Sequence, residues 1–165
     1  MLKEMANILK VGIADWKICT APDTITTIGL GSCVGIVIYT TNDNYCGLLH
    51  IMLPSSKEIK NNTNRAKFAD TGIEDMVAAL EKKGMKRGSM KAKIAGGAKM
   101  FQFSNKSELG TVGDRNVNSV KEALRNYRIP IVSEDVGADY GRTITFKLDT
   151  KMLTVRCAGR PDKDI

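Results

Sequence analysis

The chain has 165 residues, of which 42% are hydrophobic and 26% are charged. These fractions are close to the averages of globular proteins, about 45–50% and about 25%, and exclude disordered and fibrous classes. Its length predicts one domain over residues 1–165, with a substantial core. No apolar run reaches the roughly 18 residues of a membrane-spanning helix. Because the charged pair Lys3-Glu4 stands where a signal peptide has its apolar stretch, we expect a cytoplasmic protein without membrane insertion.

The chain is basic, with 25 Lys and Arg against 18 Asp and Glu, a net charge of +7. A basic protein favours acidic partners, which include nucleic acid, an anionic membrane surface or an acidic protein. Aromatic residues make up only 5%, too few for extensive base stacking, and the chain has no zinc-finger or RNA-binding signature. The composition therefore favours a solvated basic face over a nucleic-acid interface.

The first part of the chain predicts strands separated by turns. A loosely alternating stretch comes first, then a Thr- and Ile-rich stretch that leads into three glycines within residues 29–35. Two apolar stretches on either side of the polar turn 41–44 predict an antiparallel hairpin. The four expected strands cover residues 8–16, 24–30, 36–39 and 46–53.

The second part predicts two helices and four more strands. Ile73, Met76, Val77 and Leu80 form one apolar stripe at helical spacing, and Gly84 is suited to the position after that helix. A second helix is expected from an N-cap at Asp114 to a stop at Pro130. The further strands are expected at residues 91–95, 129–133, 143–148 and 153–157. About eight strands with two main helices predict an α+β fold, a layered α/β sandwich of mostly antiparallel strands.

The four cysteines, Cys19, Cys33, Cys46 and Cys157, form no CxxC pair, so the sequence predicts no metal site. Nor does any motif predict a cofactor. Reduced thiols are expected without a secretory signal, at least three of them as small buried hydrophobes. His50 is the only histidine, so any imidazole chemistry depends on it.

One cysteine and this histidine form a candidate catalytic pair. Cys33 lies at a strand-to-turn junction between Gly31 and Gly35, which leave space for a substrate, and a thiol nucleophile needs a base such as His50. Thr27 precedes the glycine turn and offers a hydroxyl that could orient the imidazole. A simple hairpin, however, pairs His50 with Ile36, about 10 Å along the strand from Cys33. These residues alone leave open a thiol catalyst or a buried cysteine beside a packed histidine.

Two further motifs favour structural roles. Gly96-Gly97 follows a strand but lacks the GxxxxGK[ST] and GxGxxG patterns, so close backbone packing is favoured over phosphate binding. Asp114-Arg115-Asn116 at a helix start could bind an anion, although a cap with a salt bridge is the favoured interpretation.

Four blocks of the sequence stand in a fixed order: residues 27–34 with Leu49-His50, then 95–101, 112–117 and 135–142. Together they resemble the CheD family of chemoreceptor glutamine deamidases. Ala138 stands where that family's pattern leads us to expect a second glycine.

The resemblance implies a Cys33–His50–Thr27 triad and a layered sandwich shared with the deamidating domain of a bacterial cytotoxin. It implies deamidation of glutamine side chains on the cytoplasmic helices of methyl-accepting chemotaxis receptors, and CheC phosphatase as a partner. The alternative is a non-catalytic adaptor of the same fold that binds receptor or CheC.

Overall fold

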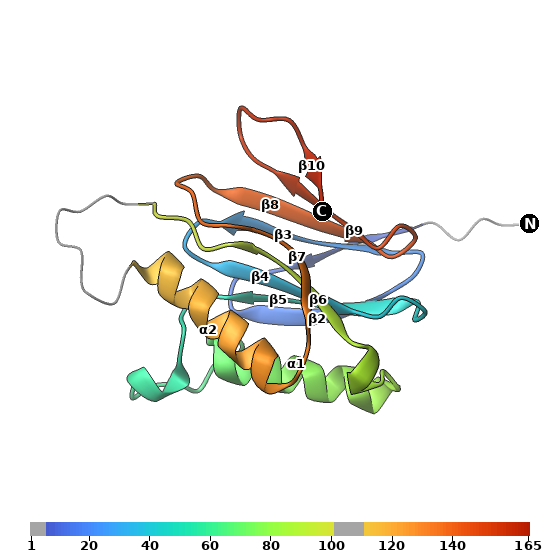
Figure 1. The fold of residues 1–165 in the computed structure, drawn as a ribbon, viewed down its shortest axis with the longest axis horizontal. Helices are drawn as coiled ribbons and strands as arrows, with labels where there is room; N and C mark the ends of the chain where they lie inside the picture. Colours follow the sequence, from blue (N-terminus) through green and yellow to red (C-terminus); the bar gives the residue numbers. More distant parts are fainter. Residues whose placement is uncertain (1–5, 101–110) are drawn as a thin grey trace, which may run out of the picture.

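The computed structural model describes residues 6–100 and 111–165. Two five-stranded sheets and two long helices are stacked as three layers (Figure 1). Lys3-Glu4, and Phe101 of the 95–101 block, lie outside the described residues. The outer sheet has the order β1 (Ile8–Val11), β3 (Thr24–Leu30), β8 (Arg142–Lys147), β9 (Met152–Arg156) and β10 (Lys163–Asp164). The central sheet has the order β2 (Asp15–Thr20), β5 (Tyr45–Ile51), β4 (Val34–Tyr39), β6 (Lys91–Gly96) and β7 (Ile131–Val136).

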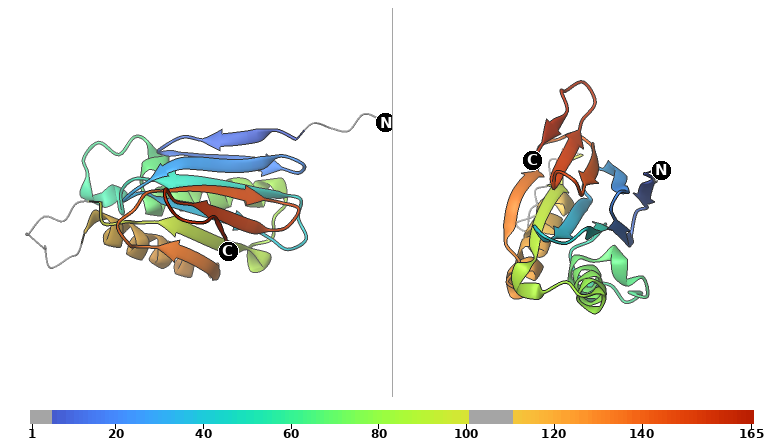
Figure 2. Two further views of the ribbon diagram at one scale, coloured as in Figure 1. Left: turned by 90° about the horizontal axis from the view of Figure 1, so that it is seen from above. Right: turned by 90° about the vertical axis from the view of Figure 1, so that its right-hand side faces the viewer.

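Two apolar layers cover the two faces of the central sheet. Every residue of β4 and β5 is buried, because the outer sheet covers one face and the helices the other (Figure 2). Along β4, Val34 and Ile36 pack on the helix side, whereas Val37 packs between the sheets. This alternation is the two-residue period of a strand, and it fixes which side chains can meet between the sheets.

Helices α1 (Ala69–Lys83) and α2 (Val112–Asn126) cover the remaining face of the central sheet. The predicted stripe of α1 is confirmed, since its four apolar residues are buried, and Gly84 caps the helix with φ of 118°. The N-cap of α2 is Thr111, so the prediction of Asp114 is wrong. Asp114 is the third helical residue and completes a capping box with Thr111. Three short 3₁₀ turns cover Ser56–Glu58, Arg65–Lys67 and Arg87–Ser89. In the described part of the chain, no helix is long and apolar enough to cross a membrane.

The expected α+β sandwich of mostly antiparallel strands is confirmed. Among the residues that the structure describes, six strand pairs are antiparallel, and only β1 with β3 and β6 with β7 are parallel. The single strand expected over 8–16 is wrong: the chain turns at Ala14, with φ of 56°, and passes from the outer to the central sheet. Together with β10, this gives ten strands within residues 6–100 and 111–165, rather than about eight.

Candidate active site

Thr27 and His50 meet between the two sheets. Thr27 lies on β3 of the outer sheet and His50 on β5 of the central sheet, with 1% of each residue exposed. Thr27 Oγ1 lies 2.7 Å from His50 Nδ1. The contact joins residues 23 positions apart in the sequence and places a hydroxyl where it can orient an imidazole.

A second bond made by Thr27 fixes the protonation of the ring. Thr27 Oγ1 also donates to the carbonyl of Val11, at 2.7 Å. A hydroxyl has one hydrogen, so the oxygen that gives it to Val11 must accept from His50 Nδ1–H. The other nitrogen, Nε2, then carries a lone pair. It is buried and has no hydrogen-bond partner among the described residues. A neutral imidazole held this way can accept a proton at Nε2, where no hydrogen-bond donor is bound.

Cys33 lies on the same face of the central sheet as His50. The strand register pairs His50 with Gly35, two residues after Cys33, so both side chains point between the sheets. The predicted pairing of His50 with Ile36 is wrong by one residue, because the turn is centred between Asn42 and Asp43. A shift of one residue changes the face: beside Ile36, His50 would point toward the helices and away from Cys33.

Burial sets the resting protonation of both groups. It lowers the pKa of His50 to about 4. It also raises the pKa of the Cys33 thiol, against a smaller lowering from that residue's own backbone N–H. At neutral pH the site therefore holds a thiol and an uncharged imidazole rather than an ion pair.

Three successive carbonyls hold the Cys33 loop in place. The carbonyl of Gly31 accepts from the N–H of Ala98, and that of Cys33 from the N–H of Gly97, both at 2.8 Å. Between them, the Ser32 carbonyl accepts from Asn116 Nδ2 at 2.8 Å. Two distant segments thus fix the loop before β4 through its backbone. None of these bonds uses the Cys33 side chain.

The Gly96-Gly97 turn confirms the expectation of close backbone packing. Gly96 has φ of 113°, and a Cβ there would lie 2.2 Å from the Cys33 carbonyl oxygen. A Cβ on Gly113, in the first turn of α2, would lie 2.5 Å from the carbonyl of Ala98. Only glycine permits these approaches, so the two blocks at 95–101 and 112–117 bring strand, loop and helix together around Cys33.

The block at 135–142 supports the same turn from the other side. The N–H of Gly137 donates to the Gly96 carbonyl at 2.9 Å, and the N–H of Lys99 to the Ala138 carbonyl at 2.8 Å. The side chain of Arg142 is fully buried and forms an ion pair within this block, with Nη2 lying 3.3 Å from Asp135 Oδ1. Ala138 has φ of 58°, a left-handed conformation that explains why we expected glycine there.

The sequence placed Asn116 in the helix-start motif and in the block at 112–117, but it indicated no role for this residue by itself. The favoured cap and salt bridge are confirmed for its neighbours, since Asp114 completes the capping box of α2 as its third residue and Arg115 pairs with Glu58. Asn116 itself is fully buried and bonds the backbone of residues 84 and 64 positions away. The signals available were its place in those two motifs and an amide side chain on the buried face of a helix.

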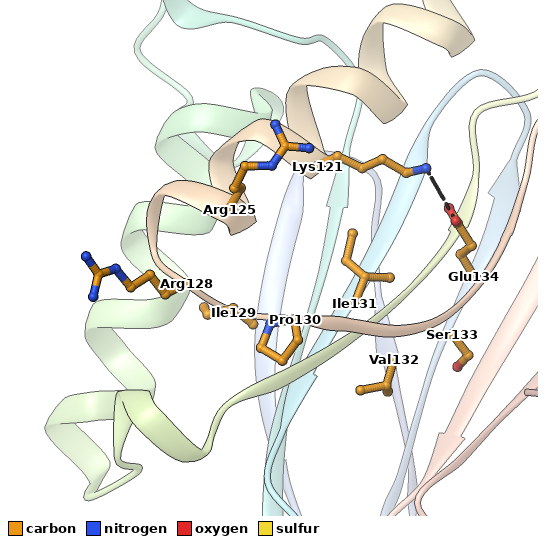
Figure 3. Close-up of a pocket in the computed structure, with 9 residues that line it drawn as sticks. All are labelled: Lys121, Arg125, Arg128, Ile129, Pro130, Ile131, Val132, Ser133 and Glu134. Atoms are coloured by element: carbon orange, nitrogen blue, oxygen red, sulfur yellow. Dashed lines mark hydrogen bonds and ion pairs between the residues drawn. The ribbon is translucent and has the colours of Figure 1, made fainter.

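A groove elsewhere on the molecule contains none of these residues. It lies between the end of α2 and β7, and Lys121 reaches across it to Glu134 at 3.0 Å (Figure 3). Its lining consists of Lys121, Arg125, Arg128, Ile129, Pro130, Ile131, Val132, Ser133 and Glu134. The remaining cysteines are free and buried, which confirms that at least three act as small hydrophobes.

The buried neutral His50 is expected to make stability depend on pH. Its pKa of about 4 lies below the ordinary value of 6.5, so the unfolded chain binds its proton first as the pH falls. The free energy of unfolding should then decrease between about pH 6.5 and 4, by about 3 kcal/mol at 1.36 kcal/mol per pKa unit. Denaturant titrations across this range measure it. Because His50 is the only histidine, His50→Gln should remove this dependence; an unchanged slope in that variant would contradict the assignment.

Comparison with known proteins gives a consistent family. Residues 52–157 match the family model described as CheD chemotactic sensory transduction, a stretch that begins after His50. The chain is 51% identical to the probable chemoreceptor glutamine deamidase CheD of Lachnoclostridium phytofermentans, over 98% of this chain and 100% of the relative. It is 48% identical to the chemoreceptor glutamine deamidase CheD of Halalkalibacterium halodurans, again over 98% and 100%. Identity to that of Bacillus subtilis is 46%, over 97% of each chain.

Proposed function

This chain belongs to the CheD family, and we propose that it deamidates glutamine side chains of methyl-accepting chemotaxis receptors. In this proposal Cys33 is the nucleophile, His50 the base and Thr27 the residue that orients the imidazole. The observation that carries it is the Thr27–His50 contact, which leaves Nε2 as a buried acceptor on the face of the sheet that carries Cys33. A structural histidine would be expected to use both ring nitrogens.

In the first half of the reaction, His50 Nε2 takes the proton of the Cys33 thiol as the sulfur attacks the carboxamide carbon. The tetrahedral oxyanion needs N–H donors. Gly31 N–H is already committed to the Gly29 carbonyl at 3.1 Å, so we assign this role to the N–H groups of Ser32 and Cys33. The C–N bond then breaks, the nitrogen takes the proton from His50, and ammonia leaves a thioester on Cys33.

In the second half, water attacks the thioester while His50 takes a proton from it. The C–S bond breaks, the proton returns to the sulfur, and the product is a glutamate side chain. Each turnover adds one negative charge to the receptor. Charge added to one of several packed helices changes their mutual repulsion and can bias a signalling state. The net charge of +7 is consistent with docking to an acidic receptor surface.

The test is incubation of this protein with a cytoplasmic receptor fragment from the same organism, read by peptide-level mass spectrometry. Conversion of particular glutamines to glutamate is expected, with release of an equal amount of ammonia. A fragment that binds the protein but is never converted would refute the enzyme and favour the adaptor. We propose CheC as a further partner, and its addition should compete with the receptor fragment.

Thr27→Val is expected to slow deamidation by about 10–100-fold, because a 1 Å misplacement of a reacting group can cost as much. Valine has nearly the shape of threonine but no hydroxyl, so the ring loses its bond at Nδ1. Thr27→Ser keeps the hydroxyl and should retain most of the rate. Steady-state kinetics on the receptor fragment compare the two; equal rates would exclude an orienting role for this hydroxyl.

A further inference from the structure

The strand ladders stop one residue short of the nucleophile. The pairing of β4 begins at its first residue, Val34, which pairs with Ile51 of β5 on one side and Gly96 of β6 on the other. Cys33 lies just outside both ladders. On the β6 side, the bond from Gly97 N–H to the Cys33 carbonyl continues the attachment. On the β5 side, β5 turns away, since the N–H of Met52 donates to the carbonyl of Lys67 at 2.9 Å.

Asn116 closes this gap. Its Nδ2 donates to the Ser32 carbonyl at 2.8 Å and to the Met52 carbonyl at 2.9 Å. Ser32 precedes the nucleophile by one residue, and Met52 follows His50 by two. The two hydrogens of one amide therefore bridge the two chain segments that carry the thiol and the imidazole. Within the described residues, no other hydrogen bond joins the Gly31–Cys33 loop to the segment after β5.

The oxygen of the Asn116 amide argues against a purely structural role for this residue. Asn116 Oδ1 is buried without a hydrogen-bond partner among the described residues, and an unsatisfied buried acceptor is unfavourable for folding. A buried amide with one end unsatisfied is an arrangement that proteins tolerate mainly where function requires it.

We infer that Asn116 is a positioning residue that sets the separation of Cys33 and His50 by bridging the Ser32 and Met52 carbonyls. The inference rests on the proposed function. Asn116 touches neither the thiol nor the imidazole and acts through the backbone on each side. Without it, the Cys33 loop would remain attached on the β6 side only and could move away from the base.

The experiment compares wild type, Asn116→Ala, Asn116→Asp and a matched control, Val120→Ala. Val120 lies one turn further along α2 and is also fully buried, so its truncation destabilises the same helix without touching the bridge. Three quantities are measured for each: the thermal midpoint of unfolding, the pH dependence of Cys33 alkylation by iodoacetamide, and kcat with KM on the receptor fragment. Alkylation is read on the Cys33 peptide, apart from the other thiols.

Asn116→Ala should reduce kcat by about 10–100-fold and leave KM unchanged. It should also move the alkylation profile of Cys33 to higher pH, because the thiol loses the neutral imidazole that takes its proton. An ionised aspartate cannot donate a hydrogen bond, so at neutral pH Asn116→Asp should have a kcat as low as that of Asn116→Ala. Val120→Ala should lower the midpoint of unfolding but keep the wild-type profile and kcat. A wild-type profile in Asn116→Ala, or an equal displacement in Val120→Ala, would overturn the inference. If wild type fails to deamidate, the proposed function falls, and alkylation still tests Asn116.

Discussion

Cys33→Ala is expected to abolish receptor deamidation while leaving the fold intact. The thiol is the only nucleophile that the protein supplies in the proposed reaction, and loss of a nucleophile from a comparable triad lowers kcat by about 10⁶-fold. The backbone of residue 33 is held by bonds to its carbonyl and to those of its two predecessors, and none of them involves the side chain. Circular dichroism and thermal unfolding should therefore resemble wild type, and the variant should still bind the receptor fragment.

Cys157→Ala is the matched control. Cys157 is a free thiol in the same apolar layer between the sheets, with 8% of the residue exposed against 9% for Cys33. Its removal costs similar packing but no nucleophile, so deamidation should continue near the wild-type rate. Deamidation by Cys33→Ala at a comparable rate would remove Cys33 from the mechanism, whereas its loss in both variants would indicate damage to the layer.

Gly96→Ala is expected to destabilise the protein by about 2–5 kcal/mol and to inactivate it. The added Cβ would lie 2.2 Å from the carbonyl oxygen of Cys33 and 3.2 Å from the Cα of Val34. These are backbone atoms, which cannot rotate aside. Overpacking costs about 1–3 kcal/mol, and the positive φ adds about 1–2 kcal/mol. Any relaxation must move Cys33, the proposed nucleophile, so activity should fall further than stability alone explains.

Gly159→Ala separates the two contributions. Gly159 also has a positive φ, 74°, but a Cβ there meets no atom within 4 Å. That variant should lose about 1–2 kcal/mol in denaturant unfolding and keep full activity when folded. If Gly96→Ala were no less stable than Gly159→Ala, the close approach to Cys33 would not be real.

Local patterns were sufficient for much of the fold. The strand predicted at 24–30 has the bounds of β3, and the stripe from Ile73 to Leu80 is the buried face of α1. Both signals are contained within a few consecutive residues. The division of 8–16 into β1 and β2 was missed because the turn between them depends on Ala14 in a left-handed conformation. An alanine in a sequence does not predict that conformation.

The candidate site shows the same boundary between local and distant information. Glycines around Cys33 and the single histidine suggested the pair, but the choice of face depended on a hairpin register that one residue decides. The role of Asn116 could not be predicted, because its two hydrogen-bond partners lie 84 and 64 residues away in the sequence. Nothing near position 116 distinguishes an amide that bridges two strand ends from one that caps a helix.

The glycines that surround Cys33 record proximity of backbones rather than chemistry. Gly96 and Gly113 are required because main chains pass too close for a Cβ, and Gly97 because a Cβ there would meet the Val117 side chain. All three would be required whether or not a thiol stood at position 33. The blocks at 95–101 and 112–117 thus describe a scaffold that does not depend on the thiol. Under the proposed mechanism, a relative that exchanged the cysteine would keep the shape and most of the recognisable sequence, so a single sulfur atom would separate an enzyme from a pure binding protein.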